Sequence, residues 1–419
     1  MSIRETIARL HSRGRFGELG LERIERLMTR LGDPQDATPA VHVAGTNGKG
    51  STAAMVEAAW RAAGYRTGLY TSPHLTDWRE RIQVMGRPIP PRKLAAHLAV
   101  IEAALAEGSD PLTEFEAWTA VAFLYFRAEG VERAAVEVGL GGRLDATNVM
   151  RRPRATAIVS IGLDHVERLG GSLGSIAREK AGVAKPGVPM VVGELPEEAL
   201  AVVREAPRAV GAPLFLAGRD FTYAAQGPNW QFSGFGRELR TMLALVGPHQ
   251  AANAAVAAAL LLTSDPDLKS ESIEAGLAGV RWPGRNEQIS REPEVWLDAA
   301  KNPLGTAALR RHLDEAAPGK GIRLVFGCLD ERDPAALLAP LADRVEALLL
   351  VPIKDERGLT GERLEAAARQ VGLMGRLGTL PEAVRFLEET PAGQVGLATG
   401  SFYLVGPLRK LLVAPRRRR

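Results

Sequence analysis

The segment VHVAGTNGKGST, residues 41–52, indicates the fold class of this 419-residue chain. It runs from a short β-branched stretch through closely spaced glycines into the helical pattern of residues 53–63. Such a strand–loop–helix unit lets backbone N–H groups and a helix N-terminus converge on phosphate oxygens. Lys49 adds a mobile positive charge. The segment therefore predicts a phosphate-binding loop at a βα junction.

The spacing of this loop departs from the Walker pattern G-x-x-x-x-G-K-[ST]. Gly50 separates Lys49 from Ser51, and Gly45 lies only three residues before Gly48. A glycine-rich turn followed by an ordinary surface lysine is the alternative. We favour phosphate binding because strand, loop and helix lie in the order that the motif needs.

Short apolar runs alternate along the chain with longer stretches of helical period, which is typical of parallel sheets with crossover helices. The expected buried strands are residues 40–43, 134–138, 155–161, 188–192, 294–297, 323–326, 347–351 and 395–398. Ligands of open α/β sheets bind beyond the carboxyl ends of the strands. We therefore look for function in residues 45–52, 139–148, 162–165, 327–333 and 400–401.

A cluster of turn residues, Trp282-Pro283-Gly284-Arg285, predicts a domain boundary. The fold class is therefore α/β. We expect a large P-loop ATPase-like domain with a parallel sheet over residues 1–284. A smaller Rossmann-like α/β domain follows over residues 285–419.

The composition excludes several classes of protein. The formal charge is +4, and Arg416 to Arg419 carry all of it. A neutral body argues against a nucleic-acid-binding surface, and the short arginine run is more simply a solvated terminus. The single Cys328 excludes an internal disulfide and a thiolate zinc cluster. The chain shows no long apolar run and no apolar leader. We therefore expect a cytoplasmic protein with no nucleic-acid or membrane partner.

Ten segments resemble one branch of the Mur ligase superfamily, the folylpolyglutamate synthases and dihydrofolate synthases. They follow one another along the chain in the same order as in that family. They are HVAGTNGKGS (42–51), GLERIERLMTRLGDPQ (20–35), TSPHL (71–75), ERI (80–82), TEFEAWTAVAFLYF (113–126), EVGLGGRLDATN (137–148), GLDH (162–165), EKAGVAKPGVP (179–189), HQAAN (249–253) and WPGRNE (282–287).

The resemblance implies an ATP-dependent amide ligase that uses ATP and Mg²⁺ and acts as a monomer. Its substrates would be L-glutamate and either a reduced folate or dihydropteroate, joined through an acyl phosphate. The sequence contains no nucleophile elbow, and this reaction needs none. A Mur-type ligase acting on a cell-wall nucleotide precursor is the alternative, and TSPHL and LDATN favour the folate substrate.

The resemblance also assigns residues to the nucleotide and the metal. The expected phosphate-binding residues are Thr46, Asn47, Gly48, Lys49, Gly50, Ser51 and Thr52; Asn253 would contact adenine, and Arg285 and Asp298 would belong to the nucleotide site. The expected metal ligands are Ser51, Ser72, Glu137 and His165. Each of the last three has an ordinary alternative: a turn cap at Ser72, an edge-strand charge at Glu137, and a loop hydrogen bond at His165.

The catalytic residues implied by the resemblance are Lys49, Lys180, Asp298 and Lys301. Lys180 lies in the E-K-A-G motif, which implies a carbamylated lysine. A neutral amine in a buried site can add carbon dioxide to become an anionic carbamate. A surface lysine paired with a glutamate is the commoner arrangement.

The resemblance further places the acceptor and the incoming amino acid. Thr113, Phe115 and Asp145 would bind the pterin, although a core role is the default for Phe115. Arg81 would bind a carboxylate through its guanidinium fork. In LDAAKNP (297–303), Lys301 replaces the usual histidine and Ala299 the usual glycine. Lys301 and Ser401 would lie on the glutamate side of the site.

Overall fold

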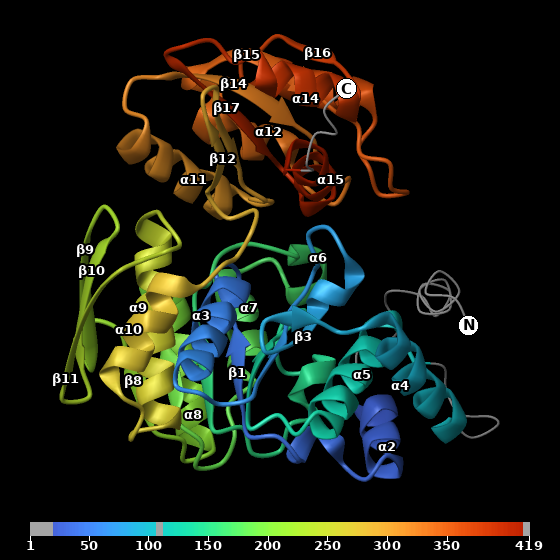
Figure 1. Cartoon of the computed structure of the whole chain (residues 1–419), viewed down its shortest axis with the longest axis vertical. Helices are drawn as coiled ribbons and strands as arrows, with labels where there is room; N and C mark the ends of the chain where they lie inside the picture. Colours follow the sequence, from blue (N-terminus) through green and yellow to red (C-terminus); the bar gives the residue numbers. More distant parts are fainter. Residues whose placement is uncertain (1–19, 106–111, 414–419) are drawn as a thin grey trace. The chain divides into compact units, whose positions relative to one another are not determined.

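The computed structural model describes residues 20–105 and 112–413, and Figure 1 shows its helices and strands. The chain divides into two compact units. The first contains the described residues up to Pro73, Arg79–Ala244 and Gln250–Val280. The second contains His74–Trp78, Leu245–His249 and the described residues from Arg281 onward. The division thus falls four residues before the boundary expected at Gly284, and the Arg416 to Arg419 run lies outside the described residues.

The first unit is built on an eight-stranded sheet of order β4-β3-β2-β5-β1-β6-β7-β8. Its strands are β1 (Ala40–Ala44), β2 (Thr67–Tyr70), β3 (Ile82–Val84), β4 (Arg87–Pro88), β5 (Arg133–Glu137), β6 (Ala155–Ile158), β7 (Met190–Val192) and β8 (Leu214–Leu216). The six strands β2, β5, β1, β6, β7 and β8 are parallel to one another. Strand β3 pairs antiparallel with β2, and β4 pairs antiparallel with β3. The expected α/β fold class is therefore confirmed.

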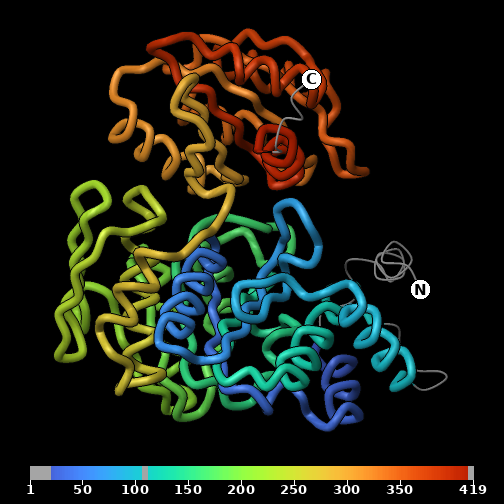
Figure 2. The backbone as a smooth tube through the Cα atoms, viewed as in Figure 1, coloured from blue at the N-terminus to red at the C-terminus, as the bar shows by residue number. Residues whose placement is uncertain are grey.

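Helices connect the strands of this sheet and flank it, and Figure 2 shows the path of the backbone through them. They are α2 (Glu22–Arg30), α3 (Lys49–Ala62), α4 (Pro91–Ala104), α5 (Glu114–Ala128), α6 (Val166–Leu169), α7 (Leu173–Ala181), α8 (Glu197–Ala209), α9 (Pro248–Ser264) and α10 (Ser270–Gly279). Helix α10 packs tightly against α3: a Cβ at Gly276 would lie 2.4 Å from the Ala59 Cα atom. Small residues at this crossing bring the two helices close together and hold α3 in place.

The first unit also contains an antiparallel sheet that the sequence analysis did not predict. It consists of β9 (Phe221–Gln226), β10 (Asn229–Gly234) and β11 (Arg237–Met242). Along β10, Trp230 and Phe232 are buried while Asn229, Gln231 and Ser233 are exposed. This alternation is the period-two pattern of a sheet with one covered face.

The second unit has a six-stranded sheet of order β12-β13-β17-β14-β15-β16, parallel except for β12. The strands are β12 (Glu287–Arg291), β13 (Glu294–Leu297), β14 (Gly321–Phe326), β15 (Val345–Leu350), β16 (Gly375–Leu377) and β17 (Gln394–Thr399). The helices are α11 (Pro303–Ala316), α12 (Pro334–Leu338), α13 (Gly361–Gln370), α14 (Leu380–Glu388) and α15 (Phe402–Val413). Leu324 and Phe326 of β14 belong to one core cluster and Val325 to another, so both faces of this sheet are covered.

The eight expected strands are all present; β13 has the expected bounds, and the other seven have shifted ends. Besides β9–β11, the strands β2, β3, β4, β8, β12 and β16 were not predicted. The largest difference follows Ile158, where the expected strand 155–161 leaves the sheet three residues early. There the Ser160 carbonyl accepts from the Thr46 amide at 2.7 Å, so this stretch pairs with the loop between β1 and α3. Among the described residues, no helix is long and apolar enough to span a bilayer.

Candidate functional site

The carboxyl ends of four neighbouring strands lie at one edge of the first sheet. Val43 of β1 pairs with Glu137 of β5, Ala44 pairs with Ile158 of β6, and Tyr70 of β2 pairs with Val136. The segments that follow these strands therefore begin side by side. This is the edge at which ligands of open α/β sheets bind.

The loop between β1 and α3 has the backbone geometry of an anion cradle. Gly45 and Gly48 have φ values of 150° and 82°, and a Cβ at Gly48 would lie 2.2 Å from the Asn253 Oδ1 atom. The amides of Thr46 and Asn47 donate to Ser160 and brace the loop from outside. The first-turn amides of α3 have no intrahelical acceptor, and with Lys49 they form the anion-binding end of this helix.

Lys49, Ser72 and Glu137 come together from three separate segments. The Lys49 ammonium lies 3.9 Å from the Glu137 Oε1 atom and donates to the Thr46 carbonyl at 3.4 Å. The other carboxylate oxygen of Glu137 accepts from the Ser72 amide at 3.0 Å. Because β5 is flanked by β2 and β1, the alternative that Glu137 is an edge-strand charge is wrong.

The first turn of α3 also contacts the start of α9. The Gln250 amide donates to the Ser51 hydroxyl at 3.4 Å, and the Asn253 amide donates to the Gln250 side-chain oxygen at 2.9 Å. Ser51, Thr52, Gln250 and Asn253 are all buried. Gln250 was missing from the expected site residues, although it stands inside the HQAAN motif. Its position beside Asn253 on one helical turn was the available signal.

Lys180 and His165 lie on the segments after β6. Lys180 is buried on α7, and its ammonium donates to the Gly45 carbonyl at 2.9 Å, at the start of the phosphate loop. The surface alternative for Lys180 is therefore wrong. His165 precedes α6 with a φ of 52°, and its Nε2 atom lies 3.8 Å from the Asp164 carboxylate.

The donor atoms at this edge fit a hard divalent cation. Glu137 offers carboxylate oxygens, and Ser51 and Ser72 offer hydroxyl oxygens, which are ligand types that Mg²⁺ accepts together with phosphate oxygens and water. In residues 20–105 and 112–413 no three His, Cys, Asp or Glu side chains cluster as a metal site. A cation here would therefore depend on serine and phosphate oxygens as well.

Arg81 belongs to a partly aromatic environment beside β2. Its guanidinium carbon lies 5.5 Å from the Trp118 ring centroid, and its side chain is largely buried. Trp118 in turn donates to the buried Glu114 carboxylate at 3.2 Å. Trp118 and Glu114 lie one helical turn apart on α5. Neither was among the expected site residues, because a tryptophan suits an ordinary core and Glu114 suits the first turn of a helix.

Phe115 lies at the start of α5, half-buried, with its ring against Tyr70. The two ring centroids are 6.1 Å apart at an interplanar angle of 28°. Thr113 caps the same helix: its hydroxyl accepts from the Glu116 amide at 3.2 Å, while Glu116 accepts from the Thr113 amide at 2.7 Å. This reciprocal capping box fixes the start of α5 and therefore the position of Phe115.

Asp145 is buried and organises the loop after β5. Its carboxylate accepts from the amides of Leu140 and Thr147, at 2.8 and 3.0 Å, and from the Thr147 hydroxyl. Burial raises the pKa of Asp145, and these hydrogen bonds oppose the rise. The Thr147 hydroxyl also lies 2.7 Å from Nε2 of His42 on β1. Burial lowers the pKa of His42 to about 3.

This buried histidine predicts a pH dependence of stability. The folded state keeps His42 neutral down to about pH 3, whereas the unfolded chain binds a proton near pH 6.5. As pH falls below 6.5, we expect His42 to cost about 1.4 kcal/mol of unfolding free energy per pH unit. In His42→Gln, the unfolding free energy should fall less steeply with decreasing pH, by that amount per pH unit. Urea titrations at pH 6.5, 5.5 and 4.5 measure this free energy. Identical slopes for both proteins would contradict this expectation.

In the second unit, Asp298 follows β13 and is buried. Its carboxylate accepts from the amides of Asn286 and Ala300, both at 2.8 Å. Burial raises the pKa of Asp298, and nearby Arg285 opposes that rise. The Arg285 guanidinium carbon lies 4.5 Å from the Phe402 ring centroid. Asp298 and Arg285 are therefore close neighbours in this structure.

Lys301 and Ser401 also follow adjacent strands, because Leu297 of β13 pairs with Ala398 of β17. Lys301 is half-buried just before α11, which Asn302 caps by accepting from the Gly305 amide at 2.9 Å. Ser401 is buried and accepts from the Tyr403 amide at 3.1 Å. The Gly400 amide donates to the Ala300 carbonyl at 3.1 Å and links the two loops.

Two family matches cover most of the chain. Residues 43–261 match the Mur ligase middle domain, and residues 284–402 match the Mur ligase glutamate ligase domain. The dihydrofolate synthase/folylpolyglutamate synthase of Bacillus subtilis is 33% identical over 431 residues, covering 96% of this chain and 97% of that protein. A probable bifunctional folylpolyglutamate synthase/dihydropteroate synthase of Haloferax volcanii is 39% identical over 340 residues. Those residues are 77% of this chain but only 40% of that relative.

Solved structures extend these matches to the whole fold. E. coli FolC in complex with DHPP and ADP is 33% identical, has a TM-score of 0.92, and aligns over 100% of this chain and 99% of its own. A bifunctional folylpolyglutamate synthase/dihydrofolate synthase with Mn, AMPPNP and L-glutamate bound is 33% identical. It has a TM-score of 0.89 and covers 98% of both chains. The chain belongs to the Mur ligase superfamily, in the branch of the folylpolyglutamate synthases and dihydrofolate synthases.

Proposed function

We propose that this chain is a folylpolyglutamate synthase, an ATP-dependent ligase that adds L-glutamate to the glutamyl carboxylate of tetrahydrofolate. Addition of glutamate to dihydropteroate, the dihydrofolate synthase reaction, is a second activity of the same site. The observation that carries this proposal is the meeting of Lys49, Glu137 and Ser72 beside the loop between β1 and α3. The names of the relatives support the choice of substrates.

The reaction balances in two steps. A carboxylate oxygen of the acceptor attacks the γ-phosphorus of ATP, which gives an acyl phosphate and ADP. The amine of L-glutamate then attacks the acyl carbon, inorganic phosphate leaves, and the amine loses a proton. Positioning and charge neutralisation supply most of the rate enhancement of such transfers.

The first unit contributes the nucleotide-binding residues. The first-turn amides of α3 and Lys49 neutralise phosphate charge, with Thr46, Asn47, Gly48, Gly50, Ser51 and Thr52 forming the cradle. Asn253 would contact adenine. In the second unit, Arg285 and Asp298 are the residues that we propose for the nucleotide. Ser51, Ser72, Glu137 and His165 would hold Mg²⁺, which would supply neutralisation of the phosphate charge when bound. The contact between Gln250 and Ser51 orients the hydroxyl toward this task.

Lys180 enters the proposal as a carbamate. Lys180 is buried with its Nζ atom 2.9 Å from the Gly45 carbonyl, beside the loop between β1 and α3, and this position supports the proposal. Addition of carbon dioxide to that amine would form a carbamate and release one proton. A crystal grown with Mg²⁺ and bicarbonate should show planar density beyond Nζ. A bare ammonium there would reject the carbamate.

The acceptor binds in the first unit. Phe115 stacks on the pterin ring, Asp145 and Thr113 meet its polar edge, and Arg81 binds a carboxylate of the acceptor. The Thr113 hydroxyl would reach the ligand through the lone pair that its single capping hydrogen bond leaves available. The incoming glutamate belongs to the second unit, where Lys301 and Ser401 follow adjacent strands. A lysine at 301 provides a fixed positive charge for a substrate carboxylate.

The test is phosphate release with ATP, Mg²⁺ and L-glutamate, in separate reactions with tetrahydrofolate, dihydropteroate and a UDP-linked cell-wall precursor. We expect turnover with the first acceptor and a measurable rate with the second. Turnover with only the UDP-linked acceptor would replace the proposal by the cell-wall alternative. No turnover with any acceptor would reject the ligase assignment.

We further place the enzyme in the cytoplasm as a monomer. Cys328 is buried, and burial raises the pKa of its thiol to about 12. Such a thiol stays protonated and unreactive, which suits a reaction without a cysteine nucleophile. Sedimentation of the purified chain tests the monomer directly, since a dimer would have twice the mass of 44.9 kDa.

A further inference from the structure

We propose that Gly139 is a positioning residue that sets the place of the Phe115 ring and thereby the affinity for the acceptor. The inference rests on the proposed function, in which Phe115 stacks on the pterin. Gly139 itself would not touch the substrate. It would act by leaving room for an aromatic ring.

The argument begins with the space above Gly139, which follows β5. A Cβ at this position would lie 2.3 Å from the Cζ atom of Phe115 and 2.8 Å from both Cε atoms. Carbon atoms in contact lie about 3.5–4.0 Å apart. All three of the nearest atoms belong to the Phe115 ring, and none belongs to the backbone. Any side chain at 139 therefore displaces that ring specifically.

The backbone of Gly139 would accept a larger residue. Its φ lies outside the left-handed region, in contrast to the neighbouring Gly141 with a φ of 67°. Alanine at 139 therefore adds no backbone strain of the left-handed kind. The need for glycine at 139 therefore comes from the space that the Phe115 ring occupies and not from the backbone conformation of Gly139.

The Phe115 ring is also restrained on its helix. Tyr70, which it stacks against, is fully buried, and its hydroxyl lies 3.1 Å from the Thr119 hydroxyl. Thr119 in turn donates to the Phe115 carbonyl at 2.9 Å. A ring pushed away from Gly139 therefore cannot move into Tyr70 without disturbing a packed and hydrogen-bonded core. A side chain at 139 would therefore force the Phe115 ring out of the position in which it would stack on the pterin.

Gly139 lies between the two proposed pterin contacts. A Cβ at Gly139 would point at the Phe115 ring. The backbone amide of Gly139 is one of the hydrogen-bond donors that oppose the rise in the pKa of Asp145. Alanine at 139 keeps that amide. The substitution therefore separates the stacking contribution of Phe115 from the polar contribution of Asp145.

The experiment measures kcat and the KM values for tetrahydrofolate and ATP in Gly139→Ala. We expect the KM for tetrahydrofolate to rise about 10-fold, the upper range for one aromatic pair. The KM for ATP and the kcat at saturating acceptor should stay within about 2-fold, because the phosphate loop is unchanged. Gly279→Ala is the matched control, since a Cβ at that α10 residue meets nothing within 4 Å.

A double-variant cycle tests whether the effect passes through the ring. In a Phe115→Ala background the ring is absent, so adding Gly139→Ala should change the KM for tetrahydrofolate by less than about 2-fold. If Gly139→Ala alone fails to fold, the double variant should fold, because it removes the clash. A double variant that stays unfolded while Phe115→Ala folds would overturn the inference.

Two other outcomes separate this inference from the proposed function. A wild-type enzyme that turns over no folate acceptor rejects the function itself. A wild-type enzyme that does turn over tetrahydrofolate, with an unchanged acceptor KM in Gly139→Ala, rejects only the role of Gly139. Equal rises in the KM for ATP and for tetrahydrofolate would also reject it, because they indicate general damage to the fold.

Discussion

Lys49→Ala is expected to lower kcat by about 1,000-fold, because loss of one preorganised charge at a reacting group costs about 100- to 1,000-fold and a transferring phosphoryl group is highly charged. The Lys49 ammonium lies 3.9 Å from Glu137 and beside the amide-lined start of α3. Its removal takes away the mobile cation of the loop. The backbone amides are fixed in place and cannot move with the phosphoryl group as it is transferred. Phosphate release in saturating ATP and acceptor measures the effect.

Lys93→Ala is the matched control for this loss of catalysis. Lys93 is also an ion-paired lysine of the first unit, but it is exposed and pairs with Glu129. Its replacement should leave kcat within about 2-fold, since exposed pairs contribute little. Thermal unfolding of both variants shows whether the fold is retained. A folded Lys49→Ala protein with near wild-type kcat would remove Lys49 from the phosphoryl-transfer step.

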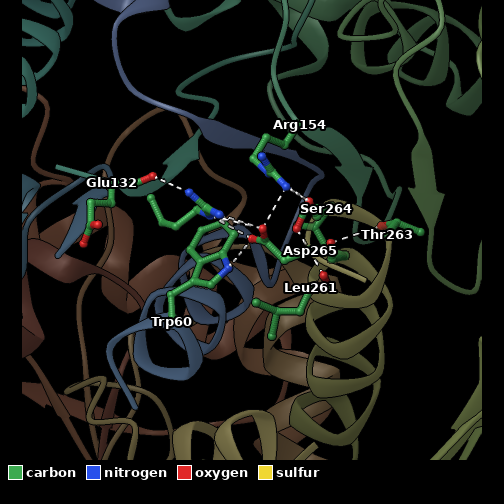
Figure 3. A network of polar contacts seen from close by, with 9 residues as sticks. Trp60, Glu132, Arg154, Leu261, Thr263, Ser264 and Asp265 are labelled. Atoms are coloured by element: carbon green, nitrogen blue, oxygen red, sulfur yellow. Dashed lines mark hydrogen bonds and ion pairs between the residues drawn. The ribbon is translucent and has the colours of Figure 1, made fainter. Parts of the chain in front are cut away.

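Asp265→Ala is expected to have the largest effect on stability, about 3 kcal/mol or more of unfolding free energy. Asp265 is buried just after α9 and holds a network shown in Figure 3. It accepts from Trp60 Nε1 at 2.8 Å, from Arg133 through two nitrogens at 2.9 Å each, and from Arg154 at 2.8 Å. Alanine would leave two guanidinium groups and an indole N–H without this acceptor. Urea unfolding measures the loss.

Asp36→Ala is the control for Asp265→Ala. Asp36 pairs with the exposed Arg151 at 3.0 Å, and we expect this variant to lose less than about 1 kcal/mol. Arg133 begins β5 and Glu137 ends it, so the Asp265 network lies about 13 Å along the strand from the catalytic edge. Below its unfolding temperature, Asp265→Ala should therefore keep a kcat within about 3-fold of wild type. Equal stability of the two variants would contradict the role of this network.

The local pattern of the chain was sufficient to predict the α/β class and eight of the strands, but not the other nine strands of the described residues. Apolar runs such as that of β1 are buried on both faces, and burial of a parallel strand requires this composition. The sheet β9–β11 was missed because its strands carry many polar residues and so lack the continuous apolar runs of buried parallel strands. Strand ends were misplaced where a loop competes for the backbone, as at Ser160.

The sequence alone predicted the loop between β1 and α3, because its signal is local: a strand, closely spaced glycines, a lysine and a helix start within twelve residues. Which distant residues meet at this loop depends on the tertiary fold. Glu137 reaches Lys49 and Ser72 because β5 lies between β2 and β1, an order set by packing over the whole chain. The same holds for Gln250 beside Ser51 and for the Phe115 ring above Gly139. Such contacts depend on side-chain fit between segments far apart in the chain, and no local pattern encodes them.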